Sequence, residues 1–427
     1  MAIEDDVLVV GGGLAGVAAA VASARTGART RLVSHKQSTL RNASGLVDVL
    51  GYAPDGEGPL VDPFAALEAL PDGHPYSVVG RSAVDSGLAL FDDAVGDAYR
   101  GGHTRTNALV PTHGGTVKPT ARYPESAAAG LASRPEDALL VGFETLVDFD
   151  APAAADHLAS AGVPFGTRGV TVGFPGELRA DAKVTRYAHL LDRDADVAVG
   201  GETRGARTAL AEAVKPHLDG EARVGFPAVL GDDRPDEVRL VLEAELGADV
   251  FEVPMGPPSL PGLRLEDRLY AAAREAGVRI ETGNPVVGYE AGEGRVEHVL
   301  VERTHQAVPY AAEEYVLATG GLVGGGIDTD RESVREPVFG CHVPHPDDRY
   351  DWAEDRAFGE HAFARFGVVP DGSLRPTGPD GEAAFENLRA AGSVLGGADF
   401  AAEKSGGGIS LATGYVAGRT AGERVHA

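Results

Sequence analysis

The feature that most constrains the fold lies at the start of the chain. The segment 7–10 consists of four consecutive branched apolar residues, which predicts a β-strand buried on both faces, as in a parallel sheet. Gly11, Gly13 and Gly16 follow at G-x-G-x-x-G spacing, and the Ala-rich segment 17–24 predicts a helix. In this motif the glycines permit a tight turn, the approach of a pyrophosphate to the backbone, and close packing of helix on strand. The free N–H groups of the helix favour a phosphate, so we expect Gly11, Gly13, Leu14, Ala15 and Gly16 to bind a dinucleotide or flavin phosphate; the alternative is a purely structural turn.

The segment 28–33 predicts the second strand of a β-α-β unit. In most dinucleotide sites an acidic residue about 20 positions after the glycines binds the ribose hydroxyls. Here Ser34 takes that place, followed by His35 and Lys36. The missing carboxylate argues against NAD and is compatible with a flavin, including one without adenosine. His35 and Lys36 fit a solvated strand end equally well.

Later segments are also predicted to line the cofactor. The polar loop 37–50 directly follows the second strand, although an ordinary Ser-Gly turn fits its sequence nearly as well. The segment 314–321 is another buried strand that ends in small residues, and 387–397 is a short strand that enters a glycine turn. The predicted lining residues are Ser34, Ser44, Gly45, Ala318, Thr319, Gly320, Gly392, Gly396, Gly397, Gly406, Gly407 and Gly408.

The triple glycine 406–408 precedes a predicted terminal helix over 409–424. The positive end of such a helix suits the O2/N1 edge of a flavin, where negative charge collects on reduction. A helix with a glycine-rich start and no ligand is the alternative. Together the two glycine-hinged helix starts, one near each end of the chain, favour a flavin.

The length of 427 residues predicts two joined domains. We expect an α/β, Rossmann-like FAD/NAD(P)-binding flavoprotein fold over residues 1–52 and 280–427. Between them, residues 53–279 are expected to form an inserted α+β cap that contacts substrate or another subunit. Short strands are predicted there at 139–141, 223–227 and 249–253.

The composition excludes several classes of function. The formal net charge is −26, from 64 acidic and 38 basic residues, and only five of the bases are lysines, so nucleic acid is not an expected partner. This balance is typical of a high-salt cytoplasm, where the Debye length falls to about 3 Å. No apolar run is long enough to span a membrane, so a cytoplasmic protein is expected. Cys341 is the single cysteine, which excludes an intrachain disulfide and a four-thiolate iron–sulfur cluster.

Several polar side chains are candidates for substrate chemistry. Arg264, Arg268 and Arg274 lie on a predicted helix over 260–277, where a solvated basic face competes with an anion clamp for a phosphorylated substrate.

His74, His342 and His345 are candidate bases, and Arg335 and Arg375 candidate phosphate partners. Cys341, His342 and His345 are too few for a convincing metal site, and we expect none. No catalytic base is assigned.

The chain resembles the family formed by the B subunits of anaerobic glycerol-3-phosphate dehydrogenase over nearly its whole length, least between about 100 and 240. The segments that carry the resemblance are Gly11–Gly16, Ser44-Gly45 with Asp48, His74–Tyr76, Leu260–Leu265, Ala318–Gly321, Arg335–Pro337, Phe366–Val368, Leu374–Pro376, Ala391–Gly397 and Gly406–Gly408. The run Gly392–Gly397 followed by the triple glycine is the most specific of them.

The resemblance implies a flavoprotein subunit, with FMN as the family's usual cofactor and FAD as the alternative. It implies two partners, a larger FAD-bearing subunit and an iron–sulfur subunit that docks at the inner face of the cell membrane. The implied reaction is oxidation of sn-glycerol 3-phosphate to dihydroxyacetone phosphate, with electrons passed to quinone and then to fumarate or nitrate. Two alternatives remain: another flavin-dependent dehydrogenase of the fumarate reductase or amino-acid oxidase type, and a non-catalytic flavin-binding relay subunit.

The acidic composition yields the first testable prediction. Screening of like charges weakens as the salt concentration falls, so the fold should loosen on dialysis from molar to low ionic strength. Circular dichroism and thermal unfolding across a salt series would measure the change. Equal stability at both ends of the series would contradict the high-salt interpretation.

Overall fold

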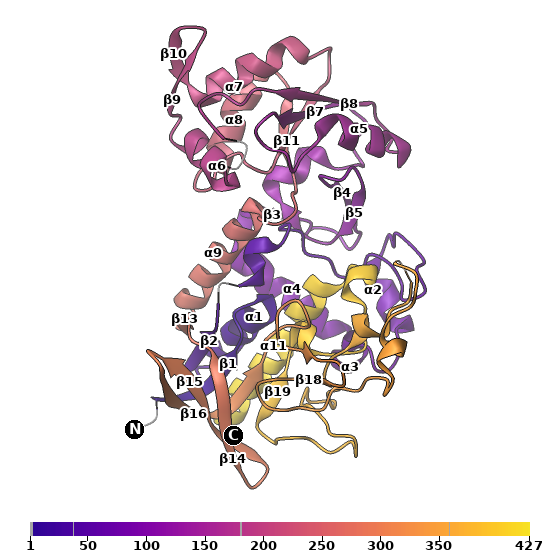
Figure 1. The fold of residues 1–427 in the computed structure, drawn as a ribbon, viewed down its shortest axis with the longest axis vertical. Helices are drawn as coiled ribbons and strands as arrows, with labels where there is room; N and C mark the ends of the chain where they lie inside the picture. The colour runs from indigo at the N-terminus through magenta and orange to yellow at the C-terminus, as the bar shows by residue number, and fades with distance from the viewer. Residues whose placement is uncertain (1–2, 37, 180–181, 358) are drawn as a thin grey trace. The chain divides into compact units, whose positions relative to one another are not determined.

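The computed structural model describes residues 3–36, 38–179, 182–357 and 359–427, so residue 37 of the predicted loop lies outside it. The chain divides into two compact units (Figure 1). The first unit comprises residues 1–39, 47–96 and 268–427, and the second comprises residues 40–46 and 97–267. This division differs from the predicted one, because residues 53–96 and 268–279 belong to the first unit and the short segment 40–46 to the second.

The first unit is built on a sheet of seven described strands in the order β13-β2-β1-β16-β15-β14, with β19 also paired to β16. β1 is parallel to β2 and β16, while β15 runs antiparallel to the first half of β16 and β19 parallel to its last residues. The carboxyl ends of β1, β2, β16 and β19 therefore share one edge, where open α/β sheets bind ligands. The bounds are β1 (Ile3–Val10), β2 (Thr30–Ser34), β13 (Arg279–Thr282), β14 (Val286–Gly292), β15 (Arg295–Arg303), β16 (Gln306–Leu317) and β19 (Leu388–Ala390).

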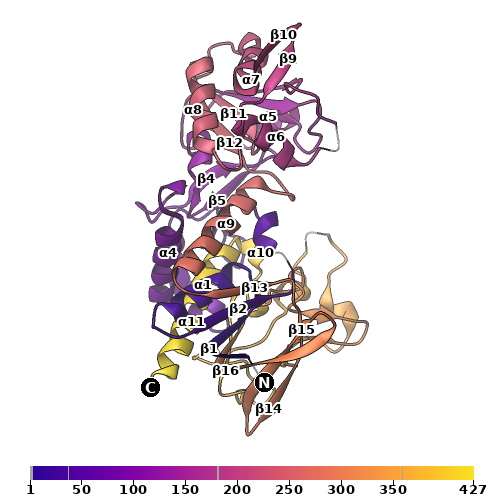
Figure 2. The ribbon, with the colours of Figure 1, turned by 90° about the vertical axis from the view of Figure 1, so that its left-hand side faces the viewer.

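Three long helices pack together in this unit. α11 (Gly406–Val425) lies against α1 (Leu14–Ala24) and α4 (Arg81–Val95), as Figures 1 and 2 show. A Cβ on Gly87 of α4 would overlap the Leu411 backbone of α11, so these two helices approach closely. This packing explains why residues 53–96 belong to the first unit: the Pro- and Gly-rich segment 52–63 is a surface loop and not a domain boundary. The remaining short elements here are α2 (Pro63–Ala66), α3 (Pro75–Val79), α10 (Phe400–Glu403), β17 (Asp328–Thr329) and β18 (Val334–Arg335).

The second unit contains a parallel sheet of four described strands in the order β12-β11-β7-β8. α5 packs on β7 and β8, while α7 packs on α8, which covers β12. The insertion is therefore a doubly wound α/β unit, more regular than the α+β cap expected from the sequence. The bounds are β7 (Ala138–Phe143), β8 (Thr167–Val172), β11 (Arg223–Pro227), β12 (Asp249–Val253), α5 (Ala151–Ser160), α6 (Val184–Asp192), α7 (Ala206–Val214) and α8 (Pro235–Leu246).

Three strand pairs accompany this sheet, and α9 (Leu260–Glu275) follows β12 in the chain. The predicted strands at 139–141, 223–227 and 249–253 are confirmed as β7, β11 and β12. β8 was not predicted, because this edge strand is half exposed and mixes Thr, Arg and Gly with Val. The strand pairs are β3 (Tyr99–Arg100) with β6 (Tyr123–Pro124), β4 (Ala108–Pro111) with β5 (Val117–Thr120), and β9 (Asp196–Val199) with β10 (Glu202–Gly205).

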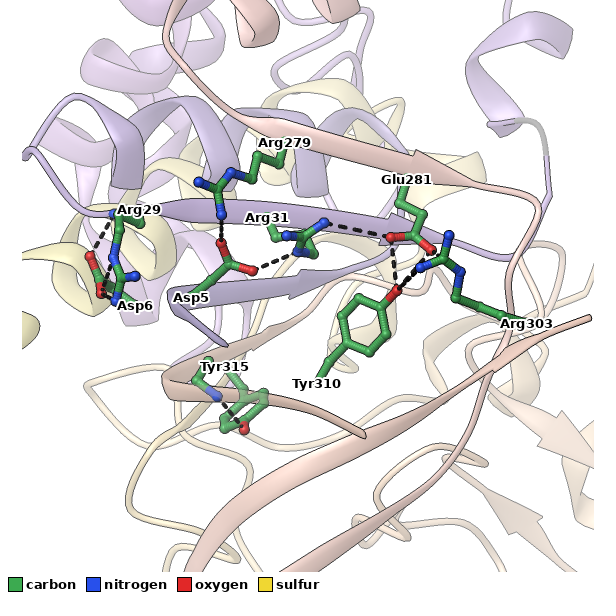
Figure 3. A network of polar contacts seen from close by, with 10 residues as sticks. Asp5, Asp6, Arg29, Arg31, Arg279, Glu281, Arg303, Tyr310 and Tyr315 are labelled. Carbon is green, nitrogen blue, oxygen red and sulfur yellow. Dashed lines mark hydrogen bonds and ion pairs between the residues drawn. The ribbon is translucent and has the colours of Figure 1, made fainter. Parts of the chain in front are cut away.

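A network of ion pairs and hydrogen bonds ties five strands of the first unit together, β1, β2, β13, β15 and β16 (Figure 3). Asp5 on β1, with only 2% of its side chain exposed, accepts hydrogen bonds from Arg31 Nε at 2.6 Å and from Arg279 Nη1 at 2.9 Å. Arg31 also faces Glu281 of β13, with 3.6 Å between Nη1 and Oε2. The carboxylate of Asp5 thus links β1 to its neighbour β2 and to the edge strand β13.

The network continues to β16 through Glu281. The Tyr310 hydroxyl donates to both Glu281 carboxylate oxygens at 2.9 Å, and Arg303 Nε lies 3.4 Å from Oε1. Burial and the adjacent Glu281 charge raise the pKa of Tyr310, so its hydroxyl remains a donor.

This network predicts that Asp5→Asn destabilises the first unit. Removing one partner of a buried ion pair typically costs about 3–5 kcal/mol, and here it leaves Arg31 with only the more distant Glu281 carboxylate at 3.6 Å. The matched control is Glu423→Gln, because Glu423 and Arg419 form a pair with both side chains 54% exposed. Denaturant unfolding of both variants should show a large loss for Asp5→Asn and little change for Glu423→Gln. Equal losses would contradict a structural role for the buried pair.

Candidate functional site

The turn after β1 has the geometry expected of a phosphate-binding turn. Gly11 has φ of +118°, and a Cβ there would overlap the Ala318 carbonyl at the end of β16. A Cβ on Gly16 would overlap the Gly11 carbonyl, so strand and helix pack as closely as predicted. Gly13 differs, because φ is −74° and the nearest atom to an added Cβ is Thr39 Oγ1 at 3.9 Å. The space above Gly13, at the N-terminus of α1, is therefore open to a ligand.

The end of β16 and the turn after β19 are joined to each other. The Gly321 N–H donates to Ser393 Oγ at 3.0 Å, and a Cβ on Gly321 would lie 2.8 Å from the Ser393 carbonyl. Gly392, with φ of +77°, lies where a Cβ would meet the Ala15 side chain at 2.5 Å. The predicted residues 318–320 and Gly392 are thus gathered around the start of α1.

The triple glycine forms the first turn of α11, which begins at Gly406 and not at residue 409. The Gly408 N–H donates to the Asp48 carbonyl at 2.6 Å, and a Cβ on Gly408 would overlap the Tyr76 hydroxyl. The N-cap residue Ser405 places no side-chain acceptor on the helix amides. The α11 N-terminus therefore keeps its partial positive charge without a side-chain cap.

Gly396 and Gly397 lie near this helix start. Their N–H groups donate to the Val368 and Arg365 carbonyls, at 3.1 and 3.2 Å. A Cβ on Gly397 would overlap the Gly73 carbonyl, so the segment before His74 packs directly on this glycine turn.

The remaining predicted lining residues are Ser34, Ser44 and Gly45. Ser44 and Gly45 belong to the second unit, where a Cβ on Gly45 would lie 2.7 Å from Pro261 Cβ and 3.3 Å from Pro124 Cγ. Ser34 lies beside the β1 turn, with its Oγ 3.0 Å from a Cβ added to Gly12, and this hydroxyl donates to the Lys36 carbonyl at 2.9 Å.

Tyr270 is a residue at this turn that the sequence did not reveal. It lies near the end of α9 and is buried, and its hydroxyl donates to the Gly12 carbonyl at 3.0 Å. A Cβ on Gly12 would overlap the Tyr270 hydroxyl, so the glycine between the two motif glycines is also required. No spacing rule connects a helix tyrosine with a turn more than half the chain away.

The arginines proposed as an anion clamp differ in their environment. Arg264 donates to both carboxylate oxygens of the buried Glu252, at 2.6 and 3.0 Å. Burial alone would raise the pKa of Glu252, but the Arg264 charge and the hydrogen bonds that the carboxylate accepts together lower that pKa. Arg268 and Arg274 are exposed, and Arg274 stacks on Tyr270 at 5.9 Å. Because Arg264 is engaged in this internal ion pair, it does not support the anion-clamp interpretation.

The candidate phosphate partners are engaged in ion pairs as well. Arg335 pairs with Asp328 at 2.8 Å, and Arg375 with Asp371 at 2.7 Å.

The candidate histidines differ in environment. His345 is packed edge-on against Trp352 and Phe366, and its Nδ1 contacts the Val343 carbonyl at 2.7 Å. His342 is exposed. His74 is fully buried and is the N-cap of α3, accepting the Tyr76 N–H at Nδ1. The structure thus gives His74 and His345 structural contacts and assigns no catalytic base.

Cys341 lies in a buried environment against Glu336. Burial and the Glu336 charge raise the pKa of its thiol, so it is a poor metal ligand and nucleophile. Within the described ranges, no three His, Cys, Asp or Glu side chains are arranged to hold a metal ion. Nor does any helix of the described part combine the length and apolar character needed to cross a bilayer.

Comparison with known proteins agrees with this geometry. The model of the FAD binding domain family matches residues 6–410, nearly the whole chain. Together with the parallel sheet and its glycine turn, this match defines the chain as a flavoprotein of the FAD-binding, oxidoreductase class. The match supports a flavin and gives no support to FMN in particular.

Curated relatives narrow the class. A protein of Halobacterium salinarum, named as the probable B subunit of anaerobic glycerol-3-phosphate dehydrogenase, is 64% identical over 426 residues, covering 100% of both chains. The B subunit of the same dehydrogenase from Vibrio cholerae is 31% identical over 431 residues, covering 96% of this chain and 95% of that protein. The chain belongs to the family of anaerobic glycerol-3-phosphate dehydrogenase B subunits.

Solved structures resemble the chain more distantly. The 3-ketosteroid-Δ4-(5α)-dehydrogenase of Rhodococcus jostii aligns over 100% of this chain and 97% of its own, with 14% identity and a TM-score of 0.40. The FrdA chain of E. coli quinol fumarate reductase aligns over 100% of this chain and 71% of its own, with 11% identity and a TM-score of 0.43.

Proposed function

We propose that this chain is the flavin-binding subunit of a complex that oxidises sn-glycerol 3-phosphate to dihydroxyacetone phosphate and passes the electrons to quinone. The observation that carries the proposal is the 64% identity over full length to a protein named for that dehydrogenase. The gathering of glycine segments from both ends of the chain at one sheet edge supports it. Fumarate or nitrate would serve as the terminal acceptor.

FAD is the proposed cofactor in place of FMN. The turn at Gly13 has room for a ligand at the N-terminus of an 11-residue helix, and a pyrophosphate is the group that such a turn holds. FAD contains a pyrophosphate and FMN does not. The FAD binding domain match over residues 6–410 points the same way.

The residues have separate proposed roles around this cofactor. Gly11, Gly13 and Gly16, with the first amides of α1, would hold the phosphates. The small residues at 318–320 and the turn 392–397 would let the ring lie against backbone, and the uncapped start of α11 would face its pyrimidine edge. When bound, the flavin would supply the acceptor for the hydride that leaves the substrate carbon.

The chain would need partners for the complete reaction. Its single cysteine cannot hold a four-thiolate iron–sulfur cluster, so electrons leaving a flavin here require another subunit to reach quinone. We propose a larger FAD-bearing subunit and an iron–sulfur subunit, the latter attaching the complex to the cytoplasmic face of the membrane.

A relay role is the second candidate function. It is favoured by the engagement of the predicted phosphate-binding and base residues elsewhere: Arg264, Arg335 and Arg375 are in ion pairs, and His74 is buried. In this version the larger subunit oxidises the substrate and this chain only carries electrons.

Anaerobic addition of glycerol 3-phosphate tests the function and separates the two versions. The flavin of this chain should lose its visible absorbance in the purified complex. Bleaching of the isolated, flavin-loaded chain as well would place substrate oxidation here, whereas bleaching only in the complex would indicate the relay. A flavin that stays oxidised in the complex would overturn both versions.

Gly13→Ala tests the cofactor site. The added methyl group meets no protein atom closer than 3.9 Å, so the fold should tolerate it at the small cost of an alanine N-cap, while the pyrophosphate loses its place. We expect FAD, identified by mass after acid release from wild type, to bind at least about tenfold more weakly, equivalent to about 1.4 kcal/mol. Gly372→Ala is the control, since its Cβ also meets nothing within 4 Å and it lies in an exposed turn. Unchanged FAD affinity in Gly13→Ala would contradict the proposed site.

A further inference from the structure

A buried carboxylate is hydrogen-bonded to the N-cap residue of α11. Glu403 is the last residue of α10, and 2% of its side chain is exposed. Its Oε1 accepts the Asp399 N–H at 3.0 Å, and its Oε2 accepts the Ser405 hydroxyl at 3.0 Å and contacts His74 Nε2 at 3.1 Å. The carboxylate is therefore held by three donors at a fixed position.

The donors that hold this carboxylate are neutral. His74 Nδ1 accepts the Tyr76 N–H at 3.1 Å, which assigns the ring proton to Nε2 and makes His74 a donor to Glu403 without a positive charge. The neighbouring Lys404 directs its Nζ to the Ala401 carbonyl instead. Glu403 thus differs from a buried carboxylate paired with arginine.

The remaining compensation comes from α11. The N-cap residue Ser405 donates its hydroxyl to Glu403. Its side chain therefore does not cap the first N–H groups of α11. The positive end of this 20-residue helix stabilises the adjacent carboxylate. By the same interaction, the carboxylate lowers the positive potential that the helix presents to a ligand.

The segment that holds Glu403 also contacts both predicted flavin-binding glycine segments. The Gly73 carbonyl lies where a Cβ on Gly397 would be, and the Tyr76 hydroxyl lies where a Cβ on Gly408 would be. This hydroxyl donates to the Val49 carbonyl at 2.6 Å, and burial, with the nearby acidic charges, raises its pKa well above the ordinary value. The position of Glu403 is therefore rigidly related to the proposed ring site.

We propose that Glu403, oriented by His74 and Ser405, is a positioning residue that sets the electron affinity of the flavin at the start of α11. The inference rests on the proposed function. Reduction places negative charge on the ring, and a fixed carboxylate next to the helix start opposes that charge. Its effect is to keep the bound flavin a stronger reductant, suited to passing electrons onward.

Glu403→Gln in the purified complex tests this inference. The variant keeps the shape of the side chain and removes the charge, so the ratio of reduced to oxidised flavin at a given potential should rise about tenfold, or about 30 mV for a two-electron couple. Glu403→Asp, which retains the charge, should stay closer to wild type.

The matched control is Glu336→Gln. Glu336 is equally buried and accepts the backbone N–H groups of Val338, Phe339 and Cys341 and a hydrogen bond from the Cys341 thiol. It should lose stability without a shift in flavin potential. Equal potentials for Glu403→Gln and wild type would overturn the inference, as would equal shifts in the Gln and Asp variants.

If Glu403→Gln does not fold, the variant Ser405→Ala tests the same inference. It removes one donor and keeps the carboxylate, so the charge is less compensated and the flavin potential should fall. An unchanged potential in Ser405→Ala would overturn the inference. A wild-type complex that takes up no flavin would instead overturn the proposed function, and the inference with it.

Discussion

The first unit depends on backbone segments that approach one another more closely than any residue with a Cβ would allow. Gly11 contacts the end of β16, and Gly16 contacts the Gly11 carbonyl. Gly414 and Gly418 let α11 lie against the backbone of α1 at Ala15 and Ala19. Because these contacts are between main-chain atoms, they fix the helix starts relative to the strand ends. A site assembled from both ends of the chain requires this rigidity.

The pairing of β16 brings together the strand ends that form the proposed ligand site. Its last residues lie between β1 and β19, so the strand ends near residues 10, 317 and 390 share one edge. The first half of β16 belongs to an antiparallel meander with β15 and contributes nothing to that edge. One long strand thus joins a structural sheet to the proposed cofactor edge, and the ion network around Asp5 and Glu281 holds its neighbours in register.

The parts predictable from the sequence were those encoded by short, contiguous patterns. Each such pattern can be recognised within a single segment, without knowledge of its partners. Examples are the glycine turn at 11–16, the late strand at 314–317 and the triple glycine at 406–408. The boundary near residue 53 failed because a Pro- and Gly-rich segment looks alike whether it joins domains or is a surface loop. What decided it was the packing of Gly87 on Leu411, a contact between distant segments. Tyr270 and Glu403 were not predicted for the same reason. Their roles depend on burial and on contacts with residues far away in the sequence.

Some of the acidic residues are buried inside the fold and have structural roles. The net charge of −26 was interpreted above through the salt concentration of the solvent. Inside the fold, several buried carboxylates in both units are paired with arginines. Asp5, Glu252 and Glu314 each face at least one arginine, and such pairs lock strands and helices together. Glu403 differs, because the contacts it makes among the described residues are with His74, Ser405 and the Asp399 N–H, while the neighbouring Lys404 directs its Nζ to the Ala401 carbonyl. The proposed influence of Glu403 on the flavin depends on this difference, because a carboxylate paired with arginine would present little net charge to a ligand.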